Sequence, residues 1–140
     1  VFYERLDLSK VIDYSREKFG DDSILALHGE SMGAATVLAE LGLYSDIDLV
    51  IAKMKYGYDF SKCNPIEDVK KSNIPICFIH EKSDSFINYH QSVDMFNVCK
   101  NPLLELHLIE NAEHACSFMV DNDNYRKIVK DFVEKVLKKK

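Results

Sequence analysis

The sequence predicts a single α/β domain, a three-layer α/β/α sandwich built around a mostly parallel sheet. Patterns typical of helices and strands alternate along all 140 residues. Short apolar runs, each as long as one buried strand, are separated by segments with helical spacing, which favours a parallel sheet covered on both faces. Hydrophobic residues make up 46% of the chain and charged residues 29%, which are ordinary values for a globular domain.

The first predicted element is a helix over residues 6–19, whose apolar side chains recur at helical spacing until Gly20 ends it. A short buried strand over 24–28 leads into a helix of small residues over 31–41, which Gly42 ends. Further apolar runs predict the remaining strands, and two more stretches have helical character. These strands are expected at 47–52, 74–80 and 103–109, and the helices at 89–99 and 121–137, the last with Asp121 as its N-cap.

Charge and composition exclude several classes of function. The formal net charge is −5 and the acidic residues are spread along the chain, whereas nucleic-acid binding needs a basic face. The only dense basic run is residues 138–140, where lysines suit the negative end of a helix dipole. No apolar run reaches 18 residues and no signal peptide is present, so we expect no membrane span.

The four cysteines indicate a reduced protein. Cys63, Cys77, Cys99 and Cys116 form no C-x-x-C pair and no short Cys/His spacing typical of a zinc site. Cys77 lies within an apolar run and is expected to pack as a small hydrophobic residue. We therefore expect a cytoplasmic protein with no metal and no cofactor.

A G-x-S-x-G motif, Gly29-Glu30-Ser31-Met32-Gly33, joins the first predicted strand to the helix after it. This context matters because a nucleophilic serine of this type sits on a strained strand-to-helix turn, where neighbouring glycines avoid steric clashes. Helix N–H groups beside the serine can then stabilise a developing oxyanion. The alternative interpretation is that Gly29 and Gly33 make only a tight turn, in which Ser31 caps the helix.

A nucleophilic serine needs a base, and the base needs an orienting carboxylate. Asp84 follows the strand predicted at 74–80, and His114 follows the strand predicted at 103–109. The carboxyl ends of parallel strands are where such sheets place active sites, and the order Ser, Asp, His is the one used with this motif. We therefore expect Ser31, Asp84 and His114 to form a catalytic triad.

Other ionisable residues fit the triad less well. His28 precedes the serine by only three residues and is expected to be structural, whereas His80 is expected to support the loop that carries Asp84. His90 and His107 fall within a helix and a strand, Asp94 lies within a helix, Asp121 follows the base, and Glu113 would point away from the site.

On these residues the chain resembles the α/β-hydrolase superfamily, in particular bacterial cytosolic hydrolases of the serine aminopeptidase-like and Bem46-like groups. The matching segments, residues 28–36, 74–84 and 112–115, extend over nearly the whole chain. The resemblance implies that Ser31 is the nucleophile, Asp84 the acid and His114 the base, with the Met32 N–H in the oxyanion hole. It also implies that the chain is the C-terminal half of that fold. The N-terminal half of the sheet, with the second oxyanion donor, would then be absent.

The sequence departs from its relatives at several positions. They usually carry glycine where Glu81 stands, and often a glycine in the turn before the histidine, where Asn111 and Ala112 stand. They also continue from the strand at 48–52 into a long helical lid, so we expect a lid segment to have been deleted, or left out, near residues 52–57. The stretch 53–73 is the least regular part of the chain.

These observations predict a serine hydrolase that cleaves a carboxylic ester or a related acyl bond, such as a thioester, of a small-molecule substrate. A serine peptidase shares the triad and remains an alternative. The other alternative is a catalytically silent fragment that acts in binding or assembly, because half a sheet exposes an edge strand to which a second copy can pair.

Overall fold

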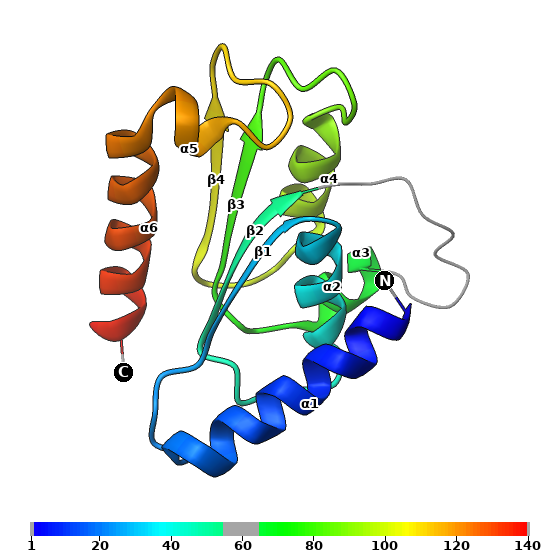
Figure 1. Cartoon of the computed structure of the whole chain (residues 1–140), viewed down its shortest axis with the longest axis vertical. Coiled ribbons are helices and arrows are strands. Elements are labelled where there is room, and N and C mark those ends of the chain that lie inside the picture. The colour runs from blue at the N-terminus through cyan, green and yellow to red at the C-terminus, as the bar shows by residue number, and fades with distance from the viewer. Residues whose placement is uncertain (1, 55–64, 140) are drawn as a thin grey trace.

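The computed structural model describes residues 2–54 and 65–139, in which four parallel strands lie between two layers of helices (Figure 1). The strands lie side by side in chain order, and each neighbouring pair is parallel. Their bounds are β1 Ala26–Ser31, β2 Leu49–Met54, β3 Ile76–Glu81 and β4 Leu104–Ile109. The helices are α1 Phe2–Phe19, α2 Met32–Glu40, α3 Pro65–Lys71, α4 His90–Val98, α5 Ser117–Val120 and α6 Asn122–Leu137. The three-layer α/β sandwich that the sequence predicts is therefore confirmed.

Each face of the sheet carries its own apolar core. On one face, α1 to α4 pack against alternate strand residues, with Leu38, Phe78 and Met95 almost fully buried. On the other face, α6 packs its apolar side against β2, β3 and β4, where Ile79 and Phe132 have no exposed surface. Since parallel strands are buried on both faces, their apolar residues run nearly without interruption, and this run is the signal that predicted them.

Each of the first three strands begins two residues later and ends one to three residues later than its apolar run predicted. The run at 24–28 predicted an end at His28, but β1 continues to Ser31, and β3 continues through Glu81. Likewise β2 extends beyond the predicted end at residue 52, with Lys53 opposite Glu30 of β1. Polar residues can end a buried strand here because they pair with one another. The nitrogen Lys53 Nζ lies 2.9 Å from Glu81 Oε1.

Two helices were not predicted. Helix α3 lies in the stretch expected to be irregular, although it has proline at its first position, acidic residues in its first turn and lysines in its last. Helix α5 is a single turn, too short for a periodic pattern. The predicted N-cap of the last helix is confirmed, because the side chain of Asp121 accepts a hydrogen bond from Asn124 N at 3.1 Å.

One side of the molecule is less covered than the other. Ala26, His28 and Glu30 alternate along β1 and are exposed, and in the described part of the chain the α6 core includes no β1 residue. Large apolar side chains of α1 are exposed too, among them Val11 and Tyr14. Within the described ranges, no helix combines the length and apolar character needed to cross a bilayer.

Candidate active site

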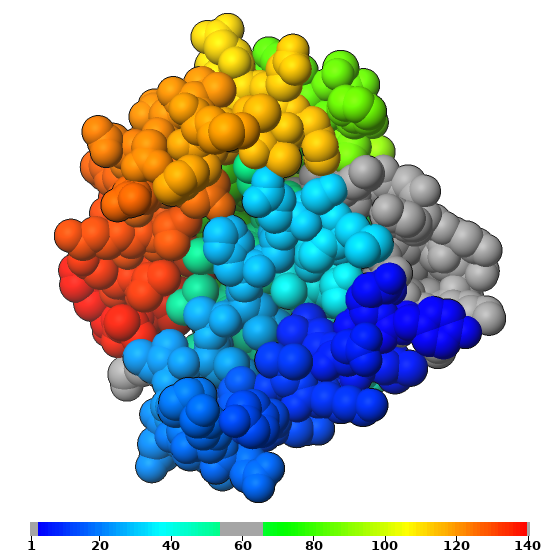
Figure 2. Space-filling model, viewed as in Figure 1, coloured from blue at the N-terminus to red at the C-terminus, as the bar shows by residue number. Residues whose placement is uncertain are grey.

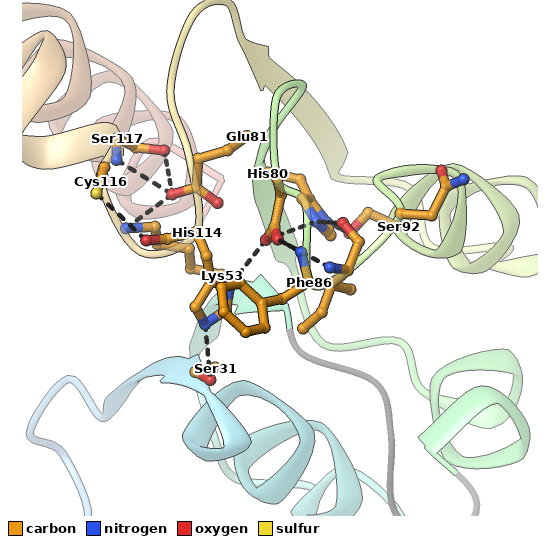
Figure 3. A network of polar contacts seen from close by, with 12 residues as sticks. Ser31, Lys53, His80, Glu81, Phe86, Ser92, His114, Cys116 and Ser117 are labelled. Carbon is orange, nitrogen blue, oxygen red and sulfur yellow. Dashed lines mark hydrogen bonds and ion pairs between the residues drawn. The ribbon is translucent and has the colours of Figure 1, made fainter.

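Ser31 occupies the junction between β1 and α2 in a backbone conformation that few residues adopt. Its φ is 55° and its ψ is −120°, in the region that favours glycine. Its side chain makes no capping hydrogen bond to α2, so the alternative that Ser31 serves only as a helix cap is not supported. The hydroxyl instead points away from the helix, toward His114 (Figure 3).

Gly29 is required by the close approach of α2 to β1. A Cβ at this position would lie 2.3 Å from Gly33 O and 2.7 Å from Ala34 Cα, distances that no real side chain tolerates. At Gly33, by contrast, a Cβ would meet nothing within 4 Å among the described residues. The expectation that both glycines avoid a clash therefore holds for Gly29 alone.

We expect Gly29→Ala to destabilise the protein by about 1–3 kcal/mol, because the backbone of the turn has to move to admit the methyl group. Urea unfolding of this variant and the parent measures the difference. Gly33→Ala is the matched control and should be neutral or slightly stabilising, because alanine is the better helix former. Equal losses in the two variants would contradict the steric argument.

The structure brings the three predicted triad residues together at the carboxyl end of the sheet. Ser31 Oγ lies 3.3 Å from His114 Nε2, and His114 Nδ1 lies 2.7 Å from Asp84 Oδ2. In the space-filling view, the loop after β4 (residues 110–116) lies against the start of α2 (Figure 2). Because the ionised carboxylate can only accept, Nδ1 carries the proton that it donates to Asp84, and Nε2 presents its lone pair to the serine hydroxyl.

The carboxylate of Asp84 is held by its own loop. Its side chain has no exposed surface, and Oδ1 accepts hydrogen bonds from Phe86 N at 2.9 Å and Ile87 N at 2.8 Å. Burial alone would raise the pKa of Asp84, but the hydrogen bonds from His114 and from these two N–H groups outweigh it and leave that pKa below its ordinary value. Asp84 is therefore ionised at neutral pH and aimed at His114.

His80 supports the Asp84 loop, as the sequence indicated. The ring is fully buried, its Nε2 donates to Ile87 O at 3.2 Å, and its Nδ1 accepts from Ser92 Oγ at 2.7 Å. Burial lowers the pKa of His80, so the ring is neutral at pH 7 in the tautomer that these two partners require. The histidine joins the loop after β3 to helix α4.

The loop after β4 turns sharply on both sides of His114. Asn111 has a φ of 55° and Ala115 a φ of 61°. Asparagine tolerates this region better than most residues, so glycine is not required at position 111. Ala112 is fully buried and its carbonyl accepts from Ser83 N at 3.2 Å, which links the His114 loop to the Asp84 loop.

Acid should destabilise the protein in two steps. Because the folded pKa of His80 is lowered, its contribution is complete above about pH 6.5 and is lost as pH falls toward the folded value. The lowered pKa values of Asp84 and Glu81 give a contribution that is complete above about pH 4–5 and is lost as pH falls further. Urea unfolding from pH 8 to 3 should show falling stability across both windows.

His80→Gln is the control for the first step. It should be less stable than the parent at pH 7, while its stability changes less between pH 7 and 5. A parallel decline in the two proteins over that range would show that another group causes the first step.

The other candidates lie elsewhere. His28 Nε2 lies 2.8 Å from Tyr125 OH, whose pKa is raised to about 12 by burial and nearby charges, so the phenol donates and His28 has a structural partner. His107 pairs with Glu105 on β4. The remaining candidates, His90, Asp94, Glu113 and Asp121, are exposed and form no part of the Ser31–His114–Asp84 contacts.

The sequence analysis did not predict three residues that lie at the candidate site: Lys53, Glu81 and Ser117. Each is buried, and together they form a polar network beside the triad. A lysine and a glutamate that end otherwise apolar strand segments were the available signal. The sequence alone could not pair them, because they are 28 positions apart.

Among the described residues, two groups of side chains have donor atoms close enough to share a metal ion, and most of those atoms already have protein partners. In the first group, His80 is hydrogen-bonded to Ser92, Glu81 to Ser117 and Asp84 to His114. Cys77, Glu105 and His107 form the second. Burial raises the pKa of Cys77 to about 12, and Glu105 accepts from Lys135 at 2.6 Å.

No family model matches the chain. Among curated proteins, it is similar to the uncharacterized protein YqkD of Bacillus subtilis (strain 168), with 28% identity over 169 residues. The match covers 95% of this chain and 55% of YqkD, so the chain spans about half the length of the curated relative.

Solved structures of hydrolases superpose closely on the chain. An esterase of Pyrococcus furiosus gives a TM-score of 0.84 at 18% identity, over 96% of this chain and 62% of the esterase. Est1E of Butyrivibrio proteoclasticus gives a TM-score of 0.82 at 17% identity, over 97% of this chain and 70% of Est1E. An α/β hydrolase from the metagenome of lagoon sediments in Morocco gives a TM-score of 0.74 at 14% identity, over 94% of this chain and 70% of that hydrolase. The chain has the α/β-hydrolase fold.

The lid segment predicted to be missing near residues 52–57 falls largely outside the described residues, as does Cys63. On the described side, β2 runs without a break through Ala52 and Lys53, opposite Gly29 and Glu30 of β1. The missing lid stays a prediction.

Proposed function

We propose that this chain carries the catalytic residues of a serine hydrolase that cleaves carboxylic esters or related acyl bonds. One observation carries the proposal: the series of contacts from Ser31 Oγ through the His114 ring to Asp84 Oδ2, at 3.3 Å and 2.7 Å. A hydroxyl, an imidazole and a buried carboxylate in this order are what acyl transfer requires. The likeness to proteins described as esterases and as a monoacylglycerol lipase supports the same reaction class.

In the proposed mechanism, Ser31 Oγ attacks the carbonyl carbon while its proton moves to His114 Nε2. Asp84 holds the ring orientation and stabilises the imidazolium. Collapse of the tetrahedral intermediate breaks the bond to the leaving alcohol, which takes the proton from His114. Water then attacks the acyl-serine, again with His114 as base, and releases the carboxylic acid and the free serine.

The oxyanion of each tetrahedral intermediate needs hydrogen-bond donors. Met32 is the first residue of α2, and N–H groups in the first turn of a helix have no acceptor within the helix. We propose that Met32 N–H is one donor and that a second comes from a segment outside the 140 residues. Losing one donor costs about 10²–10³-fold in rate, so the chain alone should be slow.

A fluorophosphonate probe tests this proposal, because it forms a covalent bond with an activated serine. The full-length protein that contains this chain should be labelled, and peptide mapping should locate the adduct at Ser31. Ser31→Ala should not be labelled. An unlabelled parent protein would contradict the hydrolase proposal and favour the alternative of a silent domain.

The substrate class is tested separately. A panel of p-nitrophenyl esters and aminoacyl anilides should give turnover with the esters. Turnover of the anilides alone would instead indicate a peptidase with the same triad.

The exposed residues of β1 and α1 favour a second role in assembly. Edge strands and exposed apolar helix faces are surfaces on which another chain or another part of the same protein packs. Sedimentation of the 140-residue chain should give a mass above that of a monomer if copies pair through this side. A monomer at all concentrations would contradict pairing between copies.

A further inference from the structure

A series of polar contacts, centred on the buried side chains of Lys53 and Glu81, lies beside the triad on the α6 side of the sheet (Figure 3). Lys53 Nζ lies 2.9 Å from Glu81 Oε1 and 3.2 Å from Glu30 Oε1. Glu81 Oε1 also accepts hydrogen bonds from Ser117, at 3.1 Å from the backbone N–H and 2.6 Å from the hydroxyl. The side chains of Lys53 and Glu81 are only 3% and 1% exposed, so solvent screens their attraction little.

Three of the four residues in this network, Glu30, Glu81 and Ser117, lie in the segments that carry the triad. Glu30 immediately precedes Ser31 on β1, Glu81 ends β3 three residues before Asp84, and Ser117 begins α5 three residues after His114. Lys53 lies on β2, the strand between β1 and β3. The buried ammonium group of Lys53 thus binds Glu30, next to Ser31, and Glu81, at the end of the strand before Asp84. Glu81 in turn binds Ser117, three residues after His114.

The position of His114 depends on contacts at both ends of its loop. On one side, Ser83 N donates to Ala112 O, and on the other Ser117 is bound by Glu81. Between these two points, Ala115 has a φ of 61°, a conformation that alanine adopts only where surrounding contacts impose it. Without the Glu81 contact, the α5 end of the loop would lose both hydrogen bonds that Ser117 makes to β3.

We infer that Lys53 and Glu81 are positioning residues, which hold the His114 loop against the Ser31 turn at the separation that proton transfer requires. The inference rests on the proposed hydrolase function. Displacing a reacting group by about 1 Å can cost about 10²-fold in rate even when the substituted residue is far from the chemistry. Neither Lys53 nor Glu81 contacts Ser31 Oγ or the His114 ring among the hydrogen bonds and ion pairs of the described residues, so their effect passes through the loops.

The charge state of Glu81 agrees with this positioning role. Burial alone would raise the pKa of Glu81, but the hydrogen bonds from Ser117 and Lys53 outweigh it and leave that pKa below its ordinary value. Glu81 is therefore a carboxylate at neutral pH and binds Lys53 as an ion pair. The competing explanation is that the pair contributes only to global stability.

The two explanations differ in what they predict for the folded protein. We would measure labelling of Ser31 by a fluorophosphonate, resolving probe affinity from the maximal labelling rate, in full-length Lys53→Met and Glu81→Gln well below their unfolding temperatures. Positioning predicts a maximal rate about 10- to 100-fold lower with unchanged affinity. Hydrogen exchange should also accelerate at the amides of residues 112–117, selectively within the protein.

Ser117 provides a milder pair of variants if the charge substitutions do not fold. Ser117→Ala removes only the hydroxyl bond to Glu81 and should slow labelling by several-fold, whereas Ser117→Thr keeps that hydroxyl and should label faster than Ser117→Ala. Phe132→Leu is the matched control, because it should destabilise α6 in the same core while leaving every polar group of the network in place. It should lower the unfolding temperature and leave the labelling rate unchanged.

The outcomes separate this inference from the proposed function. Variants that lose stability as Phe132→Leu does but label Ser31 at the parent rate would overturn the positioning role. A parent protein that does not react with the probe would defeat the hydrolase proposal and the catalytic meaning of the network with it. In that case, unchanged exchange at residues 112–117 in the variants would also show that the network does not anchor the loop.

Discussion

Replacing Ser31 by alanine is expected to lower kcat for ester hydrolysis by about 10⁶-fold, because the variant lacks the hydroxyl that forms the acyl-enzyme in the proposed mechanism. His114→Ala should cost about as much, and the double variant should be no slower than either single variant. Residues that act as one unit lose their joint contribution when any essential member is removed. Steady-state hydrolysis of a p-nitrophenyl ester by the full-length protein measures all three.

The control for this prediction is Ser85→Ala. Ser85 is an exposed serine that follows Asp84 directly in the chain, and its substitution should leave kcat within twofold of the parent. Additive losses in the Ser31 and His114 variants would contradict a shared proton-transfer unit, and a residual rate near that of the parent would exclude Ser31 as nucleophile.

Replacing Asp84 by asparagine is expected to lower kcat by about 10⁴-fold with little change in KM. The substitution keeps the size of the side chain and leaves Oδ1 able to accept from Phe86 and Ile87. The amide that replaces Oδ2 would donate to His114 Nδ1, which forces the proton onto Nε2. In that tautomer the ring cannot accept the serine proton.

The pH profile distinguishes this mechanism from a loss of structure. If the fault lies in the tautomer of His114, the activity of Asp84→Asn should partly recover at high pH, where hydroxide can substitute for the missing base. The variant should lose some stability but remain folded at the assay temperature. Asp94→Asn, an exposed substitution on α4, should have no effect on kcat. If Asp84→Asn reduces kcat by less than tenfold, another carboxylate orients the histidine.

Local patterns predicted most of the scaffold. All four strands and the two main helices after β1 and β4 lie where apolar runs and periodic spacing placed them, because burial on both faces requires such runs. The helix boundaries at Gly20 and Asp121 followed from end signals that act within a few residues. The patterns did not predict elements that are very short or strand ends that are polar. Helix α5 has only four residues, and the ends of β1, β2 and β3 carry charged side chains.

The candidate site divides in the same way. The strand-to-helix turn at Ser31 could be predicted because Gly29, the strand before it and the helix after it are contiguous in the chain. The partnership of His80 with Ser92 was not readable, since a histidine in a buried strand gives no indication of which hydroxyl it will bind. The same holds for Lys53 and Glu81, whose charges are acceptable in the core only because they meet there.

The sequence by itself determined the order of strands and helices, the strained turn at Ser31 and the chain order of serine, acid and histidine, because each depends on residues that are neighbours in the chain. Only the tertiary structure decided which side chains meet across the sheet. Parallel strands bring residues 28 to 83 positions apart within hydrogen-bonding distance, as between Lys53 and Glu81 or between Ser31 and His114. Their register follows from the packing of two cores, which no local pattern contains.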